Sequence, residues 1–198
     1  MTLTLEPYAA QIARWPQQGR VILAQFDRDS VIVYQAYSEA IGHHAVTHQR
    51  LGGSGFSFSR MSWIKPNFLW MMYRSGWASK LSQEMVLAIR IAREGFNTIT
   101  SLAVSSSFDP AAGLTHDEWK RAVGNSEVRL QWDPDHDPTG AKCERRAIQL
   151  GLRGSILRQF VEEWTLAIED MSELVHAQRQ LRHSPERLVI PREDVYPS

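Results

Sequence analysis

The sequence predicts an α+β protein with a mostly antiparallel, twisted sheet and helices packed on it. Two pairs of β-rich runs are joined by polar, turn-forming links, 20–26 with 31–37 and 127–132 with 145–152. Such links favour antiparallel hairpins, because they contain no crossover helix. Elsewhere apolar residues recur every three or four positions, most extensively over Ser155–Leu174, as is typical of helices that cover a sheet.

The length and composition indicate one domain spanning residues 1–198, long enough to bury its own core. Its 22 basic and 22 acidic residues cancel, so nucleic acid or a membrane would have to be recognised by a local patch. The single cysteine, Cys143, cannot form an internal disulfide, which fits a reducing compartment. No apolar run reaches transmembrane length and no leader-like segment is present. We therefore expect a cytoplasmic protein without a membrane partner, of unspecified oligomeric state.

In the N-terminal half, short apolar runs are separated by turn-forming residues. The expected elements are a helix over 8–15, strands over 20–26 and 31–37, a helix that Ser38 caps and that runs to about Gln49, a strand over 56–63, and a helix that begins at Pro66 and continues through 68–73.

The C-terminal half continues the same mixture of elements. The expected elements are a strand over 85–91, a helix over 93–104, a helix over 116–123 capped by Thr115, the hairpin 127–132 with 145–152, the long helix 155–174, and a further helical stretch to about 182. Residues 183–198 are polar and interrupted by prolines, so we expect a C-terminal extension that is either packed or flexible.

The central stretch, residues 56–77, combines basic and aromatic side chains and is the first candidate site. Arg60, Lys65 and Arg74 flank an apolar block that is too short to cross a bilayer and is expected to be buried. Charges at the ends of a buried block need acidic, carbonyl or anionic partners. The alternatives are an anion pocket, or side chains that reach the surface or pair with acids of the chain itself.

Two further positions are candidates for a polar site near this block. Gln35 is an amide in the middle of an otherwise apolar strand, so its side chain either satisfies neighbouring backbone or lines a pocket. Glu84 stands at the start of the predicted strand 85–91, where the alternative is an ordinary solvated acid.

Two groups of potential metal ligands carry only a weak signal. His44 and His48 are four positions apart and would share one helical face, but no third ligand follows at a typical spacing. Asp133, Asp135 and Asp137 could offer oxygen ligands to a divalent cation, yet turn-forming aspartates are the commoner reason for such a run. We predict no metal site.

Several strings closely resemble the family called domain of unknown function 4291 over nearly the whole chain, above all RMSWIKPNFLWMMYRSGW at 60–77. More loosely, the order of elements resembles the core of ADP-ribosyltransferases. That resemblance implies a nucleotide-using transferase, with NAD as a possible cofactor. It implies a serine motif at Ser57 and Ser59 and a catalytic glutamate at Glu84.

The same resemblance implies a first position near Tyr34 and Gln35, where this sequence has no arginine or histidine, with Arg20 the nearest substitute. The resemblance also implies phosphate contacts from Arg60, Lys65 and Arg74 and stacking of a base on Trp63, Trp70 or Tyr73.

Three hypotheses follow for the function. The first is a transferase of ADP-ribosyltransferase type that acts on NAD or a related nucleotide. The second is a module that binds RNA or single-stranded DNA without catalysis, with the same arginines on phosphates and the aromatics on bases. The third is a structural role in which the basic side chains only pair with acids of the chain.

Overall fold

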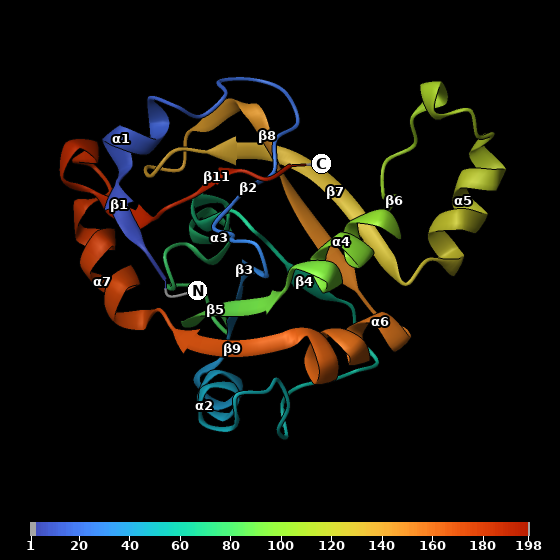
Figure 1. Cartoon of the computed structure of the whole chain (residues 1–198), viewed down its shortest axis with the longest axis horizontal. Coiled ribbons are helices and arrows are strands. Elements are labelled where there is room, and N and C mark those ends of the chain that lie inside the picture. The colour runs from blue at the N-terminus through green and yellow to red at the C-terminus, as the bar shows by residue number, and fades with distance from the viewer. Residues whose placement is uncertain (1–2, 198) are drawn as a thin grey trace.

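Two antiparallel ladders form the centre of the computed structural model, which describes residues 3–197 and confirms the α+β class (Figure 1). The three-stranded sheet has the order β3 (Ser30–Tyr37), β5 (Met85–Ala92), β9 (Thr165–Asp170). The four-stranded sheet has the order β4 (Ser62–Ile64), β8 (Lys142–Leu152), β7 (Val128–His136), β6 (Val104–Ser105), and only β6 is parallel to its neighbour.

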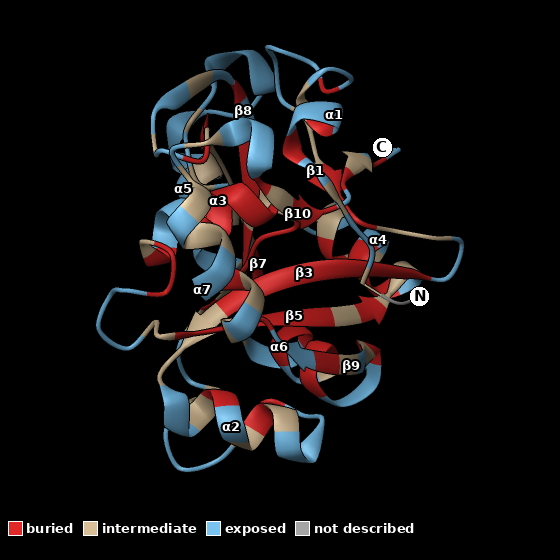
Figure 2. Cartoon of the chain, turned by 90° about the vertical axis from the view of Figure 1, so that its left-hand side faces the viewer, coloured by how far each residue is buried: buried red, intermediate tan, exposed pale blue. Residues whose placement is uncertain are grey.

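Strands β3 and β5 are buried on both faces, as Figure 2 shows. On β3, Val31 and Val33 face one hydrophobic cluster, whereas Ile32 and Tyr34 face a second. Strand β5 divides its side chains in the same way, opposite β3 in an antiparallel register. A strand enclosed on both sides needs apolar residues at nearly every position, which explains the continuous β-branched and aromatic run.

The hairpin of β7 and β8 is confirmed and is longer than expected, because β7 continues through the aspartate run to His136. The three-stranded sheet meets the four-stranded one at the end of β4. There the backbones of Tyr34 and Lys65 exchange two hydrogen bonds, 2.7 and 3.1 Å long. This bridge fixes Lys65 against the middle of β3.

Two predicted strands are wrong. In the run 20–26 only β2 (Leu23–Ala24) is a strand, and its ladder is with β11 (Asp194–Val195). The expected hairpin with β3 is reduced to a short turn and one antiparallel bridge, between Phe26 and Val31. The expected strand 56–63 is mostly a loop, and only β4 at its end joins a ladder. Apolar residues at alternate positions occur in any extended segment that buries one of its sides. In a segment with several glycines, this pattern therefore does not require a strand.

The predicted long helix 155–174 is also wrong. The chain there forms α6 (Gly154–Gln159), a π-helical segment (Phe160–Trp164) and then strand β9. Apolar residues four apart share a helical face, but an even spacing also puts them on one face of a strand, and Ile168 pairs with Ile89 of β5. Gly95 allows this arrangement, since a Cβ there would lie 2.4 Å from the Trp164 ring.

The remaining helices largely match the expected positions. They are α1 (Tyr8–Ile12), α2 (Glu39–His48), α3 (Phe68–Ser75), α4 (Arg93–Ser101), α5 (His116–Asn125) and α7 (Ser172–Leu181), with 3-10 turns at Pro110–Ala112 and Pro185–Arg187. Helix α3 is mostly buried, as its apolar sequence predicts. Over residues 3–197, no helix is long and apolar enough to span a membrane.

Of the two alternatives for the C-terminal extension, the described residues 183–197 show the packed one, and residue 198 lies outside the described residues. Strand β10 (Val189–Pro191) pairs with β1 (Leu5–Pro7), and Leu188 and Ile190 are fully buried. Figure 1 shows this segment crossing the molecule beside the N-terminal strands. The segment therefore contributes to the core that lies under α3.

Glu193 joins this segment to α3 and to the N-terminal region. Its carboxylate accepts hydrogen bonds from the Phe68 backbone N–H (2.6 Å) and the Asn67 amide (3.0 Å). Its backbone N–H donates to Gln11 and its carbonyl accepts from the Trp15 indole, both at 2.8 Å. Burial raises the pKa of this carboxyl well above its ordinary value.

Helix α3 begins at Phe68 and not at Pro66, and Asn67 caps it, because the Asn67 side-chain oxygen accepts the Trp70 backbone N–H at 2.6 Å. We expect Asn67→Ala to lower the free energy of unfolding by about 2 to 4 kcal/mol, since it removes the cap and leaves a Glu193 oxygen without its amide donor in a buried site. Denaturant unfolding measures the loss. Thr115→Ala removes the cap of the exposed helix α5 and should cost less than half as much; equal losses would contradict this account of Asn67.

Candidate functional site

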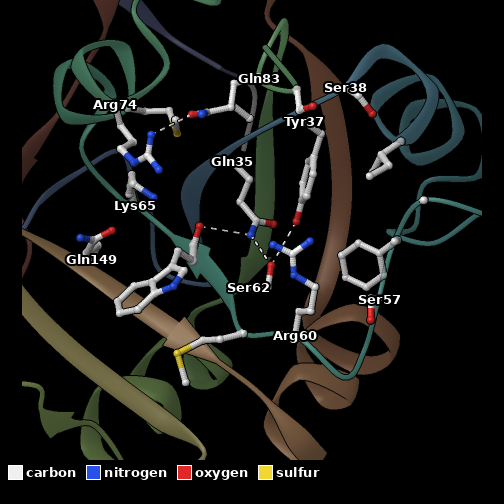
Figure 3. Close-up of a pocket in the computed structure, with 18 residues that line it drawn as sticks. Gln35, Tyr37, Ser38, Ser57, Arg60, Ser62, Lys65, Arg74, Gln83 and Gln149 are labelled. Carbon is white, nitrogen blue, oxygen red and sulfur yellow. Dashed lines mark hydrogen bonds between the residues drawn. The ribbon is translucent and has the colours of Figure 1, made fainter. Parts of the chain in front are cut away.

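A pocket of about 640 Å³ opens where the end of β3, the loop 55–61, strand β4 and helix α3 meet (Figure 3). Its wall contains three basic side chains, those of Arg60, Lys65 and Arg74. Within residues 3–197, no aspartate or glutamate lines it. The pocket therefore concentrates positive charge in a chain whose net charge is zero.

Lys65 is the most constrained of the three cations. Only 4 % of it is exposed, and its ammonium group makes no hydrogen bond or ion pair with the described part of the chain. Arg74 is exposed and donates one long hydrogen bond, 3.4 Å, to Gln83. Arg60 is exposed and makes no side-chain hydrogen bond or ion pair within residues 3–197. These three cations are thus available to a ligand.

Burial, and after it the nearby charge of Arg74, lower the pKa of Lys65 from 10.5 to about 7. Asp133 acts in the opposite direction. The Asp133 carboxylate is shared by the amides of Gln131 (2.9 Å) and Gln149 (2.8 Å), so it makes no direct ion pair with Lys65. Lys65 can therefore gain or lose a proton near neutral pH.

An amide and two hydroxyls form the polar wall, as Figure 3 shows. The Gln35 amide nitrogen donates to the Ser62 hydroxyl (2.7 Å) and to the Trp63 carbonyl (3.2 Å), and the Tyr37 and Ser62 hydroxyls lie 3.1 Å apart. Burial raises the pKa of Tyr37 to about 12, so its hydroxyl keeps its proton. The Gln35 oxygen is buried and has no partner among the described residues, which leaves an acceptor for a ligand.

The apolar wall is held by close packing against β8. Met61 and Trp63 lie over Gly151, where a Cβ would come within 2.6 Å of the methionine sulfur and 3.0 Å of the indole. Any larger residue at Gly151 would displace both side chains. Phe56 closes the other side, edge-on to Tyr37 with ring centres 6.1 Å apart.

The structure brings together about half of the residues that the sequence predicted for the site. The pocket is lined by Gln35, Ser57, Arg60, Trp63, Lys65 and Arg74, and not by Arg20, Tyr34, Ser59, Trp70, Tyr73 or Glu84.

Tyr34, Glu84 and Arg20 lie outside the pocket for different reasons. Tyr34 points to the opposite face of β3 from Gln35, where it packs edge-on against Phe68 at 5.5 Å. Glu84 is half-buried just beyond the lining residues, and its carboxylate accepts the Ser82 backbone N–H at 2.8 Å. Arg20 is exposed and its backbone forms an isolated bridge to Arg146 of β8.

Trp70 and Tyr73 belong to a different aromatic group, in which they stack with His136 of β7 at 5.4 and 3.4 Å between ring centres. Tyr73 lines a second cavity of about 340 Å³ beside Arg179 and Arg182 of the α7 region. Ser59 is exposed, and its hydroxyl is bonded to that of Ser57 at 2.8 Å.

Sequence reasoning missed Tyr37, Ser62, Gln83 and Gln149, which also line the pocket. Tyr37 could have been found, because it is two positions from Gln35 and shares its face of the strand. Gln149 could not, since it reaches the pocket from β8, far away in the sequence.

The potential metal ligands serve local structure. His44 and His48 stack at 4.1 Å, and the described chain contains no group of three or more ligating side chains able to hold a metal ion. Asp135 forms a buried ion pair with Arg145 at 2.5 Å, and Asp137 accepts hydrogen bonds from the turn that follows it.

The fold and the site together define an α+β protein with a basic, partly aromatic pocket, which no carboxylate of the described residues lines. A family model described as "Domain of unknown function (DUF4291)" matches residues 21–196. The chain belongs to this family. No curated protein matches it in a sequence search.

Replacing Lys65 should stabilise the protein without its ligand. Lys65→Met removes a buried amine that has no partner, and we expect a gain of roughly 1 to 3 kcal/mol in the free energy of unfolding. Because the pKa is lowered in the folded state, the unfolded chain binds this proton more tightly, and the stability of the unsubstituted protein rises between pH 7 and 10.5.

The gain from Lys65→Met is therefore largest below pH 7 and shrinks toward pH 10.5. Thermal and denaturant unfolding across this range measure it, with Lys120→Met on the exposed face of α5 as the control. A gain that is absent, or that grows with pH, would show that Lys65 has a partner.

Proposed function

We propose that the pocket binds a phosphorylated ligand, most plainly a nucleotide, and that the protein is a nucleotide-using transferase. The observation that carries the proposal is Lys65, which is buried without a partner among the described residues, in a pocket that Arg60 and Arg74 also line and that no carboxylate lines within residues 3–197. A buried, unpaired ammonium group is costly, and an anionic ligand would offset that cost.

The other walls suit the remaining parts of a nucleotide. A volume of about 640 Å³ is in the usual range for small-molecule sites. Trp63 and Phe56 offer ring faces and edges to a base. The unpaired Gln35 oxygen would accept a hydrogen bond from a ribose hydroxyl or a base amine, and the neutral Tyr37 hydroxyl could donate one.

The transfer step is the further part of this proposal, with NAD as the donor and Glu84 as the acid that stabilises charge on the ribose. Ser82 and Gln83, which line the pocket, directly precede Glu84. Catalysis by Glu84 requires its carboxylate to leave the Ser82 N–H and turn toward the bound ribose. A cytoplasmic location, where NAD is abundant, belongs to the same proposal.

Single-stranded nucleic acid is a second candidate ligand. Arg60 and Arg74 are exposed, and Phe56 lines the same pocket. This combination favours single-stranded nucleic acid, because the arginines could bind a backbone phosphate while a base stacks on the phenyl ring. Binding to a single-stranded oligonucleotide that weakens steeply with salt and that excludes ADP-ribose would support this alternative over a mononucleotide site.

Charge removal at the pocket should weaken nucleotide binding. We expect Arg60→Gln and Arg74→Gln each to raise the Kd for ADP-ribose at least about tenfold, since each removes a charged donor to phosphate. Isothermal titration measures the change. Arg20→Gln, which alters an exposed arginine away from the pocket, should leave the Kd unchanged. Absence of binding by the unsubstituted protein, or equal losses in all three variants, would refute the pocket assignment.

The affinity should also fall as the pH rises past about 7, because Lys65 is then uncharged while the diphosphate of ADP-ribose keeps its charge. Lys65→Met should remove this pH dependence.

The transfer step has a separate test in the release of nicotinamide from NAD. We expect Glu84→Gln to lower the rate by about 100-fold or more with little change in the Kd for ADP-ribose, because the carboxylate would act on the developing positive charge. Glu94→Gln, on the exposed side of α4, is the matched control. If the protein bound ADP-ribose but released no nicotinamide from NAD, the pocket would remain a nucleotide-binding site and the transferase proposal would be refuted.

A further inference from the structure

Lys65 differs from the other lysines of this chain because its side chain is buried. The sequence contains four lysines, and the other three, Lys80, Lys120 and Lys142, are exposed. Lys65 is 4 % exposed, lines the pocket, and has its backbone fixed by two hydrogen bonds to Tyr34 of β3. The protein thus fixes the backbone of one buried lysine at the wall of a basic cavity.

The surroundings of this amine favour its neutral form. Burial and the nearby charge of Arg74 lower its pKa to about 7, so roughly half of the molecules carry a neutral amine at pH 7. An ordinary lysine, with a pKa near 10.4, is neutral in only about one molecule in 2,500 at that pH. Only the neutral amine has a free electron pair for attack on a carbonyl carbon.

We propose that Lys65 forms an imine with the aldehyde or ketone of a phosphorylated ligand whose phosphate Arg60 and Arg74 hold. This inference rests on the phosphate binding proposed above and adds a covalent step at Lys65. The two arginines are exposed at the mouth and Lys65 is buried in the same cavity, so a ligand anchored by its phosphate would present its other end to the amine.

The step balances without an oxidant or a reductant. The nitrogen electron pair of the neutral amine forms a bond to the carbonyl carbon, the C=O π bond breaks toward oxygen, and that oxygen takes the first of the two nitrogen protons. The resulting carbinolamine loses that oxygen as water, together with the second proton of the nitrogen, and leaves a C=N bond. Hydrolysis reverses the step, so the covalent bond lasts only while the carbonyl compound occupies the site.

A purely electrostatic role for Lys65 gives a different outcome. An ammonium group that only pairs with phosphate would bind phosphorylated compounds with or without a carbonyl group equally well, and no bond would survive denaturation. The choice between the two roles depends on whether the amine can be trapped on a phosphorylated aldehyde.

Pyridoxal 5′-phosphate is a suitable probe, because borohydride reduces its imine to a stable secondary amine. The intact protein is treated with the probe and borohydride at pH 7, digested, and analysed by peptide mass spectrometry. We expect labelling of Lys65 to exceed that of Lys80, Lys120 and Lys142 at least about tenfold, since its neutral fraction is far higher at this pH. The three exposed lysines are internal controls that require no variant.

Two further arms test the role of the phosphate. Pyridoxal without its phosphate should lose most of the preference for Lys65, and Arg74→Gln should reduce the labelling of Lys65 but not that of Lys120. ADP-ribose should protect Lys65 from the probe.

The result that would overturn the inference is ADP-ribose binding to the pocket with no preferential labelling of Lys65. That outcome would keep the proposed phosphate site and remove only the covalent step. Failure of ADP-ribose to bind, with Lys65 still labelled selectively by pyridoxal 5′-phosphate, would refute the nucleotide function and retain the reactive amine.

Discussion

The hydrogen bonds of Glu193 connect the parts of the molecule on which the pocket depends. One carboxylate, supplied by the C-terminal segment, holds the first backbone N–H of α3 and the amide of Asn67. Its own backbone meets Gln11 and Trp15 from the other end of the chain. Because a buried carboxyl without donors would be strongly unfavourable, these contacts must form together. Because the first turn of α3 is held in this way, the helix places Arg74 at the wall of the pocket.

The second constraint is the position of β3 between two hydrophobic clusters. A strand buried on both faces has little room for a polar side chain, yet Gln35 interrupts its apolar run near the end. The amide is tolerated because Ser62 and the Trp63 carbonyl accept its two hydrogens. Its oxygen is left without a partner at the edge of the cavity, so the strand that organises the core also supplies a polar group to the site.

Local pattern predicts β3, β5 and the helices that cover them, because their periodicity and caps depend on neighbouring residues. It fails at β9, where a helical spacing is overridden by pairing with β5, and in the run 20–26, which pairs with the distant β11. For the site, the basic residues of the central stretch were identifiable because a buried block needs partners for its charges. The exclusion of Tyr34 follows from the alternation of side chains along β3, which its position next to Gln35 already implies. The exclusion of Glu84 depends on one backbone contact, which the sequence does not reveal.

The place of Glu193 in the sequence also bears on how the protein is made. The first turn of α3 is translated more than a hundred residues before the carboxylate that anchors it. Until residue 193 has been synthesised, the Phe68 N–H and the Asn67 amide therefore lack the carboxylate that holds them in the folded protein. The start of α3 can be fixed in its final form only after most of residues 3–197 have left the ribosome.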